Sequence, residues 1–132
     1  MSTTKAVNPW RWQEPFNFSQ AIDAEGARRI VFCAGQTSVD AEGKLLHRGD
    51  MAAQLDQAFD NLETVLAASG CTLANVVRLN YYVTDIDAFV AAGPVIDKRL
   101  AVCAAKPAGT LLGVSRLFHP DLLVEMEATA VL

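Results

Sequence analysis

Residues that could bind a metal ion or pair in disulfides are scarce in this sequence. Its 132 residues include two histidines, His47 and His119, and three cysteines, Cys33, Cys71 and Cys103. The cysteines lie far apart, no Cys-x-x-Cys pair occurs, and no histidine stands near a cysteine. This spacing argues against a zinc site. It is typical of reduced, mostly buried thiols in a cytoplasmic protein.

Positive charge and long apolar runs are also scarce. Eleven Lys and Arg stand against fifteen Asp and Glu, the net charge is -4, and no basic cluster is longer than a pair. A nucleic-acid partner is therefore not expected, because binding to phosphates needs a basic surface. No apolar run approaches membrane-spanning length, and residues 1–7 lack a basic segment followed by an apolar one. We expect no membrane partner and a cytoplasmic location.

The residues that are present favour one packed domain. Hydrophobic residues make up 52% of the chain and charged residues 20%, a balance typical of a folded globule. At this length a single domain over residues 1–132 buries a sufficient core. Residues 1–15 are expected to be an N-terminal arm, and residues 8–20 read as an extended arm or edge strand around two prolines. The aromatic side chains of this stretch either cap the core or line a pocket; they are Trp10, Trp12, Phe16 and Phe18.

Periodicity predicts the remaining elements. Residues 28–34 are rich in β-formers and end at a glycine, which predicts a strand followed by a turn. After Asp50, apolar residues recur at spacings of three and four residues, so we predict a helix that is capped by Asp50 and ends at Gly70. A second helical stretch is expected to be capped by Asp87 and to restart near Pro94, because proline breaks a helix.

Two further strands are predicted to have one apolar and one mixed face. In residues 76–83 polar and apolar side chains alternate, and in residues 122–130 the carboxylates of Glu125 and Glu127 point the same way while the residues between them are apolar. A strand is also expected within residues 106–117. We define the mixed face by the polar side chains that share it: Arg78, Asn80, Tyr82, Glu125, Glu127 and Arg116.

The expected order of elements is strand, strand, helix, strand, helix, strand, strand. This order is satisfied by an α+β, ferredoxin-like sheet with two helices on one face. Because two helices cover only one face, the mixed face needs another partner, and a second copy of the same sheet is the natural one.

Several short runs together carry a family pattern. They are Phe18-Ser19-Gln20-Ala21, Cys33-Ala34-Gly35-Gln36, Ala53-Gln54 through Asn61-Leu62 to Gly70, Val76-Val77-Arg78 through Thr84-Asp85 to Phe89, Pro107-Ala108, Val114-Ser115-Arg116-Leu117 and Val124-Glu125-Met126-Glu127-Ala128. In order and spacing they resemble the RidA/YjgF family of reactive-intermediate deaminases, formerly described as endoribonucleases or translation inhibitors. The resemblance covers roughly residues 16 to 131.

The resemblance implies a chorismate-mutase-like homotrimer with a barrel-like core and small-molecule clefts between neighbouring subunits. In active members the cleft hydrolyses imines and enamines to a keto acid and ammonia, and no metal or organic cofactor is needed. An arginine pairs with the substrate carboxylate, a glutamate positions the attacking water, and a tyrosine near the N-terminus shapes the pocket.

Transferred position by position, the family pattern is only partly retained. The glutamate falls on Glu125, which we take as the candidate catalytic residue. The tyrosine falls on Phe18, which keeps the ring and loses the hydroxyl. The arginine falls on Gly109, so the bidentate carboxylate clamp is missing and the chain resembles an arginine-lacking branch. Two positions further, where many members have a small or thiol-bearing residue, stands Leu111.

The substrate-binding candidates are thus Phe18, Gly35, Tyr82, Gly109 and Leu111. Gly35 either offers a backbone amide to a ligand or is a turn glycine. Gly109 either leaves the room that an arginine would fill or marks a bulge.

The two carboxylates of the mixed face are expected to differ in role. Glu125 is either a cleft residue or a salt-bridged strand residue, and the resemblance favours the cleft, where desolvation would suit a general acid or base. Glu127 is expected to be structural and to pair with Arg78 or Arg116 across the strands.

Three functions from different classes remain. The first is an enzyme that hydrolyses or tautomerises an imine or enamine with Glu125, acting on a neutral, aromatic or larger substrate rather than a small 2-imino acid. The second is a trimer that binds a small ligand without turning it over. The third, an endoribonuclease or translation inhibitor, ranks last because the chain is acidic and has neither a basic patch nor a histidine pair.

Overall fold

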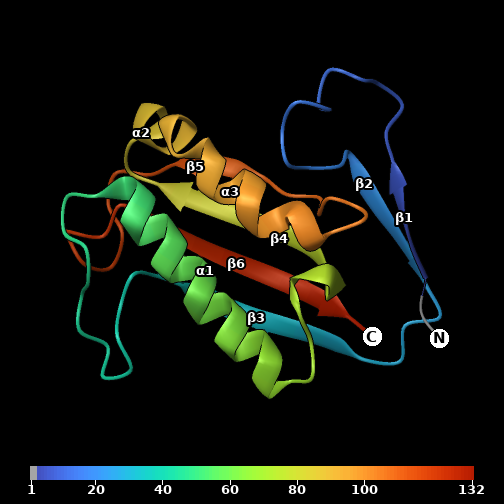
Figure 1. Ribbon diagram of the computed structural model, residues 1–132, viewed down its shortest axis with the longest axis horizontal. Helices are drawn as coiled ribbons and strands as arrows, with labels where there is room; N and C mark the ends of the chain where they lie inside the picture. Colours follow the sequence, from blue (N-terminus) through green and yellow to red (C-terminus); the bar gives the residue numbers. More distant parts are fainter. Residues whose placement is uncertain (1–2) are drawn as a thin grey trace.

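A four-stranded sheet forms the centre of the molecule in the computed structural model, which describes residues 3–132 (Figure 1). Residues 1–2 of the expected arm lie outside the described residues. The strand order is β3-β6-β4-β5, with β4 and β5 parallel and the other neighbours antiparallel. The strands are β3 (Ile30–Gln36), β6 (Val124–Val131), β4 (Val76–Val83) and β5 (Leu111–Gly113).

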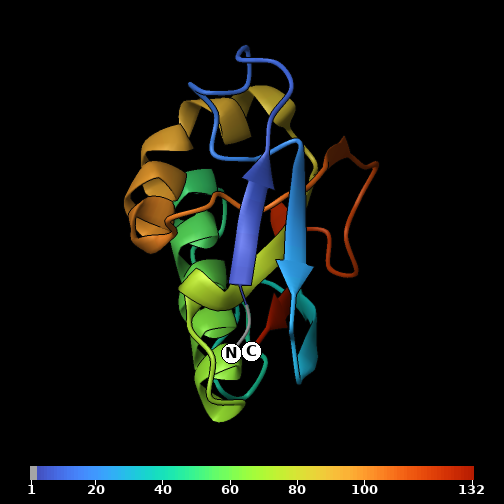
Figure 2. The same ribbon diagram turned by 90° about the vertical axis from the view of Figure 1, so that its right-hand side faces the viewer.

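A separate two-stranded sheet precedes it along the chain. It pairs β1 (Thr3–Val7) with β2 (Ala21–Glu25) in antiparallel register. The pair lies at the right-hand end of the molecule in Figure 1 and faces the viewer in Figure 2. The prediction of an extended stretch over residues 8–20 is wrong, because residues 12–17 form turns and no residue of the stretch is in a strand. Hydrogen bonds from the Glu14 amide to the Arg11 carbonyl (3.1 Å) and from the Phe16 amide to the Gln13 carbonyl (2.9 Å) close two of them.

The long helix has the predicted start and end. Helix α1 (Met51–Ala68) begins after Asp50, whose side chain accepts a hydrogen bond from the Ala53 amide at 3.1 Å. Gly70 follows the helix with φ +77°, a conformation that costs glycine little.

The second helical stretch differs from its prediction in its cap. It is divided into α2 (Ile86–Ala91) and α3 (Gly93–Arg99), and the cap is Asp85, which accepts from the Ala88 amide at 3.0 Å, whereas Asp87 lies in the first turn. Pro94 stands in the first turn of α3, where its missing N–H costs no helical hydrogen bond. Two 3-10 helices, η1 (Leu73–Asn75) and η2 (Leu100–Val102), complete the helical elements.

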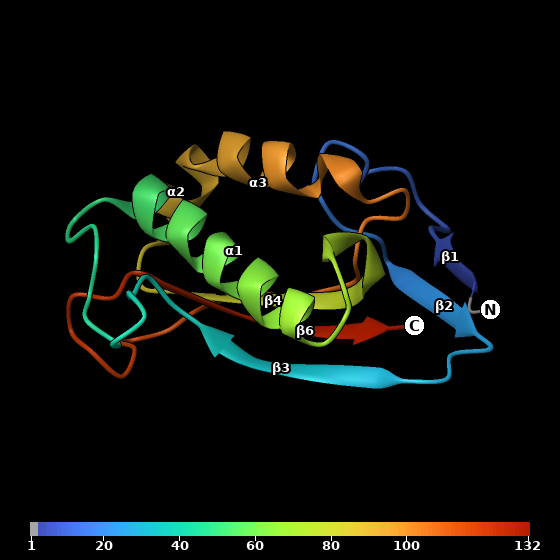
Figure 3. The ribbon, with the colours of Figure 1, turned by 60° about the horizontal axis from the view of Figure 1, so that its bottom comes forward.

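The helices cover one face of the large sheet, as predicted (Figure 3). The core lies between them, and its fully buried members include Leu55, Phe59 and Leu62 of α1 and Val124 and Met126 of β6. Among residues 3–132, no helix is both long and apolar enough to cross a membrane.

The opposite face of the sheet has no helical cover (Figure 3). Along β6 the side chains alternate between buried and half-buried from residue 124 to residue 130, with Glu125 and Glu127 on the uncovered side. On β3 the same side carries Ile30 and Phe32, whose exposed fractions are 57% and 78%. The face is therefore mixed, with apolar and acidic side chains together.

Two strand predictions need correction in their bounds. The strand predicted for residues 28–34 is β3, which begins at Ile30 and runs on to Gln36. A register shift against β6 falls between Cys33 and Gln36, so Gly35 lies in an irregular part of the strand rather than in a turn. Within residues 106–117 only β5 is a strand, joined by an isolated parallel bridge between Ala108 and Arg78.

Candidate functional site

Glu125 lies directly over Gly35 on the uncovered face. A Cβ atom built on Gly35 would overlap the Glu125 Oε2 atom and stand 2.6 Å from its Cδ. Any side chain at residue 35 would therefore displace the carboxylate, which explains glycine there by close packing rather than by a turn. The β3–β6 pairing brings these two residues together although they are far apart along the chain.

The environment of Glu125 raises the pKa of its carboxyl group. The carboxylate is half-buried, and desolvation raises its pKa above the ordinary value; the negative charge of Glu127 raises it further. A carboxylic acid with a raised pKa can exchange a proton nearer neutral pH than an exposed glutamate can.

Glu127 is held by two neighbours on β4. Its Oε1 accepts a hydrogen bond from the Tyr82 hydroxyl and another, at 3.3 Å, from the Asn80 Nδ2. The hydrogen bond from the Tyr82 hydroxyl to Glu127 is the main reason why the pKa of Tyr82 is raised. Register explains the contacts, because Asn80 stands directly opposite Glu127 and Tyr82 opposite Glu125.

The predicted pairing of Glu127 with Arg78 or Arg116 is wrong. Neither arginine forms an ion pair with a carboxylate anywhere in residues 3–132. The Arg116 guanidinium instead donates to the carbonyls of Leu117 (3.1 Å) and Phe118 (3.3 Å). The observed partners of Glu127 on β4 could have been found in the sequence, because Asn80 and Tyr82 are two positions apart in a strand and so point to the same face.

Gly109 lies in a crowded part of the backbone. A Cβ atom there would overlap the Leu79 carbonyl oxygen and stand 3.0 Å from the carbonyl carbon. The flanking ladder bonds are intact, from the Leu79 amide to the Ala108 carbonyl (2.8 Å) and from the Tyr81 amide to the Thr110 carbonyl (2.9 Å). Glycine is therefore required by close backbone approach, and position 109 is not an empty space left by a missing arginine.

Asn80 makes a side-chain hydrogen bond to the segment around Gly109. Its Oδ1 accepts a hydrogen bond from the Thr110 amide at 3.1 Å, while its Nδ2 donates to Glu127. One asparagine thus connects the acidic pair of the uncovered face to the segment around Gly109. Sequence reasoning placed Asn80 on the face but gave it no role.

Phe18 and Leu111 lie apart from the Glu125 group. The Phe18 ring packs edge-on against Trp12 at 5.9 Å, and the Ser19 amide bonds to the Pro107 carbonyl at 3.1 Å, beside the segment that leads to Gly109. Leu111 pairs with Tyr81, whose ring packs against Phe89 of α2 at 5.0 Å on the helix-covered side. Within one chain, the candidates therefore form two groups: Gly35, Tyr82 and Glu125 on the uncovered face, and Phe18, Gly109 and Leu111 around the β5 edge.

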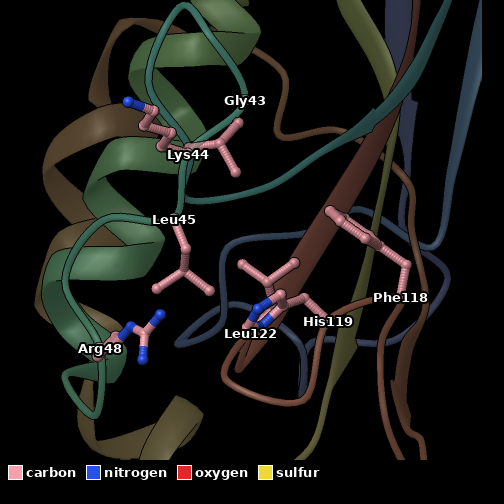
Figure 4. A pocket seen from close by; sticks show the side chains of 8 residues that line it. Gly43, Lys44, Leu45, Arg48, Phe118, His119 and Leu122 are labelled. Carbon is pink, nitrogen blue, oxygen red and sulfur yellow. The ribbon is translucent and has the colours of Figure 1, made fainter.

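One cavity is separate from both groups. Its volume is about 390 Å³, and Figure 4 shows it between the loop that follows β3 and the loop that precedes β6. Arg48, one of its lining residues, pairs with Asp121 at 3.1 Å, and the Asp121 amide donates to the lining His119 at its Nδ1. The lining residues are Val39, Gly43, Lys44, Leu45, Arg48, Phe118, His119 and Leu122.

The described residues contain no evident metal site or disulfide. No cluster of three or more His, Cys, Asp or Glu able to hold a metal ion occurs within residues 3–132. All three cysteines are buried free thiols, and burial raises the pKa of Cys33 and of Cys103.

Comparisons with known proteins agree on one family. The family model described as endoribonuclease L-PSP matches residues 12–132. A RutC family protein of Pyrococcus abyssi is 33% identical over 113 residues, covering 86% of this chain and 84% of that protein. The mitochondrial protein mmf1 of Schizosaccharomyces pombe is 31% identical over 133 residues, covering 99% and 78%. A crystal structure of YyfB from Yersinia pestis, a protein of unknown function of the conserved Rid protein family, superposes with a TM-score of 0.89 at 34% identity, and the match covers 98% of both chains.

Proposed function

This chain belongs to the RidA/YjgF family, whose model is described as endoribonuclease L-PSP, and from that membership we propose that it is a homotrimeric enzyme that hydrolyses imine or enamine reactive intermediates in clefts between subunits. The observation that carries the proposal is the Glu125 carboxylate over Gly35, half-buried on a sheet face that no helix covers.

The division of the candidates into two groups supports a cleft between subunits. Glu125 and Leu111 lie on opposite faces of the sheet, so one chain cannot line a single small pocket with both. If the uncovered face of one subunit meets the β5 edge of the next, Glu125 and Gly35 face Phe18 and Leu111. The exposed Phe32 (78%) is buried by the same association, which in the proposed trimer surrounds a barrel-like core.

In the proposed reaction, Glu125 handles the proton of the attacking water. Water oxygen bonds to the imine carbon as the C=N π bond breaks, Glu125 accepts one water proton, and the imine nitrogen takes up a proton from solvent. In the resulting carbinolamine Glu125 returns its proton to the nitrogen, the C–N bond breaks to release ammonia, and the hydroxyl proton passes to solvent as the carbonyl forms. Because its pKa is raised, Glu125 exchanges a proton more readily at neutral pH than an ordinary glutamate does. The proposed chemistry needs no metal or organic cofactor.

Gly109 argues against small 2-imino acids as the main substrates. Without a guanidinium there, the substrate carboxylate lacks a charge-assisted hydrogen-bond pair, and each such bond contributes roughly 1.5–3 kcal/mol. Binding of a small anionic imine would then be weaker by about tenfold or more. We propose a neutral, aromatic or larger substrate.

The same missing clamp favours a second candidate, a trimer that binds a small ligand without turnover. The family description as a ribonuclease comes third, because the net charge of -4 disfavours binding to phosphates. A cytoplasmic location is part of the proposal, with neither nucleic acid nor membrane as a partner.

The test replaces the carboxylate while keeping its volume. Glu125→Gln should lower the rate of imine hydrolysis by a hundredfold or more, in line with loss of a general acid or base. Light scattering should give a trimer for both proteins. The control is Glu42→Gln, an exposed turn residue, which should leave the rate unchanged.

Two results would contradict the proposal. Full activity in Glu125→Gln would show that the Glu125 carboxylate takes no part in the reaction. A monodisperse wild-type monomer would show that there is no cleft between subunits. A bound metabolite that mass spectrometry recovers unchanged after long incubation would favour the non-catalytic candidate.

A further inference from the structure

Resting on the proposed function, we propose that this site selects imines that carry no carboxylate and react as protonated iminium ions, with Glu127 as the residue that determines this specificity. A suitable substrate is the imine formed when a primary amine loses two electrons and two protons. The inference follows from the fixed charges around Glu125.

Glu127 is a carboxylate held in one orientation. The Tyr82 hydroxyl and the Asn80 amide both donate to its Oε1, while its Oε2 has no hydrogen-bond partner within residues 3–132. The side chain is half-buried on the same face as Glu125, two residues along the strand, which corresponds to about 6–7 Å. One oxygen is therefore anchored and the other is free to face a cation beside Glu125.

The cations on either side of Gly109, Lys106 and Arg116, donate to backbone carbonyls. The Lys106 Nζ, three residues before Gly109, donates to the carbonyls of Leu100 (2.6 Å) and Cys103 (3.3 Å). The Arg116 guanidinium donates to two carbonyls of its own loop. A substrate carboxylate therefore finds no free guanidinium or ammonium on the segment that carries the arginine in active relatives.

Arg78 is the remaining arginine of the mixed face, and it lies at the far end from Glu125. It pairs with Thr129 in the register, whereas Glu125 pairs with Tyr82. It also lines a separate cavity of about 260 Å³ with Gln20 and Thr129. Its charge is therefore nearer to that cavity than to the Glu125 carboxylate.

The proposed second half of the cleft adds no charge, since it consists of Phe18, Gly109 and Leu111. Two carboxylates thus dominate the field at the reacting centre. The charge of Glu127 already acts on Glu125, where it adds to the effect of desolvation in raising the pKa. The same field attracts an iminium ion and repels a substrate carboxylate.

This field also suits the chemistry of an iminium ion. Its carbon is a better electrophile than that of a neutral imine, so water attacks it once Glu125 accepts the water proton. The nitrogen already carries its proton and leaves as ammonia after one more proton transfer. No oxidant or further reactant is consumed.

The experiment compares two substrates that differ only in the carboxylate. One is 2-phenylethanimine, generated from phenethylamine by an amine oxidase, and the other is 2-imino-3-phenylpropanoate, generated from phenylalanine by an amino-acid oxidase. The readout is the ratio of kcat/KM values for ammonia release. Wild-type protein should prefer the carboxylate-free imine by about tenfold or more, and the preference should fall as sodium chloride is raised.

Glu127→Gln removes the charge and keeps the volume. It should lower the ratio by about tenfold, mainly through a higher KM for the carboxylate-free imine, while kcat changes little. The matched control is Glu25→Gln on β2, which removes the same charge from an exposed position and should leave the ratio unchanged. Light scattering and thermal denaturation check that both variants assemble.

The possible failures are distinguishable. If wild-type protein hydrolyses the 2-imino acid at least as efficiently as the matched imine, or if Glu127→Gln leaves the ratio unchanged, the specificity is wrong and the proposed enzyme remains. The wild-type ratio and its salt dependence decide the question even if Glu127→Gln fails to fold. If neither imine is hydrolysed faster than in buffer, both proposals are overturned.

Discussion

The crowding at Gly109 makes a sharp prediction about a single methyl group. In Gly109→Ala, the new Cβ would overlap the Leu79 carbonyl oxygen, so the backbone of β4 or of the segment before β5 must move by more than about 1 Å to reach ordinary contact. Backbone atoms cannot turn away as a flexible side chain can. The methyl group therefore acts on the pairing of the two strands.

The cost can be worked out from the hydrogen bonds that flank the contact. The bonds from the Leu79 amide to Ala108 (2.8 Å) and from the Tyr81 amide to Thr110 (2.9 Å) lie on either side of it. Weakening both, at about 1 kcal/mol each, with some added strain, gives a loss of about 2–3 kcal/mol in the free energy of unfolding. For a chain of this size the melting temperature should fall by about 6–12 °C.

Differential scanning calorimetry measures the loss, and hydrogen exchange of residues 108–113 locates it. The matched control is Gly93→Ala, because a Cβ at Gly93 meets nothing within 4 Å, and its melting temperature should stay within about 2 °C of wild type. A Gly109→Ala protein as stable as this control would refute the close approach. The same reasoning predicts that Gly109→Arg will not restore activity on 2-imino acids, since arginine carries the same Cβ.

Three further predictions concern other charges and contacts. Because the pKa of Glu125 is higher in the folded state than in the unfolded chain, the stability of the wild type should fall as pH rises from the unfolded to the folded pKa. In thermal melts over a pH series, Glu125→Gln should therefore unfold at a higher temperature than wild type above this pH window but not below it. Arg99, with 18% of its side chain exposed, joins α3 to Asp56, Asp60 and Glu63 of α1. Because these carboxylates are about half exposed and partly screened, Arg99→Met should lower the free energy of urea unfolding by about 1–2 kcal/mol, and a loss that 0.5 M salt does not reduce would contradict an electrostatic role. Asn80→Ala should cost about 1 kcal/mol and speed exchange of the Thr110 amide, which loses its acceptor, whereas unchanged exchange would show that Asn80 does not hold this segment.

Local patterns accounted for the elements whose faces are regular. The helix after Asp50 was predictable because its cap and its spacing of three and four are properties of neighbouring residues. The separation of Glu125 and Glu127 from the apolar side of β6 followed from the two-residue period of a strand. The N-terminal turns and the Asp85 cap were missed, since alternating aromatics and two nearby aspartates fit more than one local structure.

Family membership, the two-faced sheet and the glycine at residue 109 can all be read from the amino-acid sequence. The surroundings of the candidate residues become visible only in the folded chain: Gly35 beneath the Glu125 carboxylate, Tyr82 and Asn80 on Glu127, and the Leu79 carbonyl against Gly109. Strand periodicity is set by adjacent residues, whereas these contacts depend on the register between strands distant in sequence. A glycine that the sequence presents as a lost side chain is, in the fold, a position where the backbone leaves room for none.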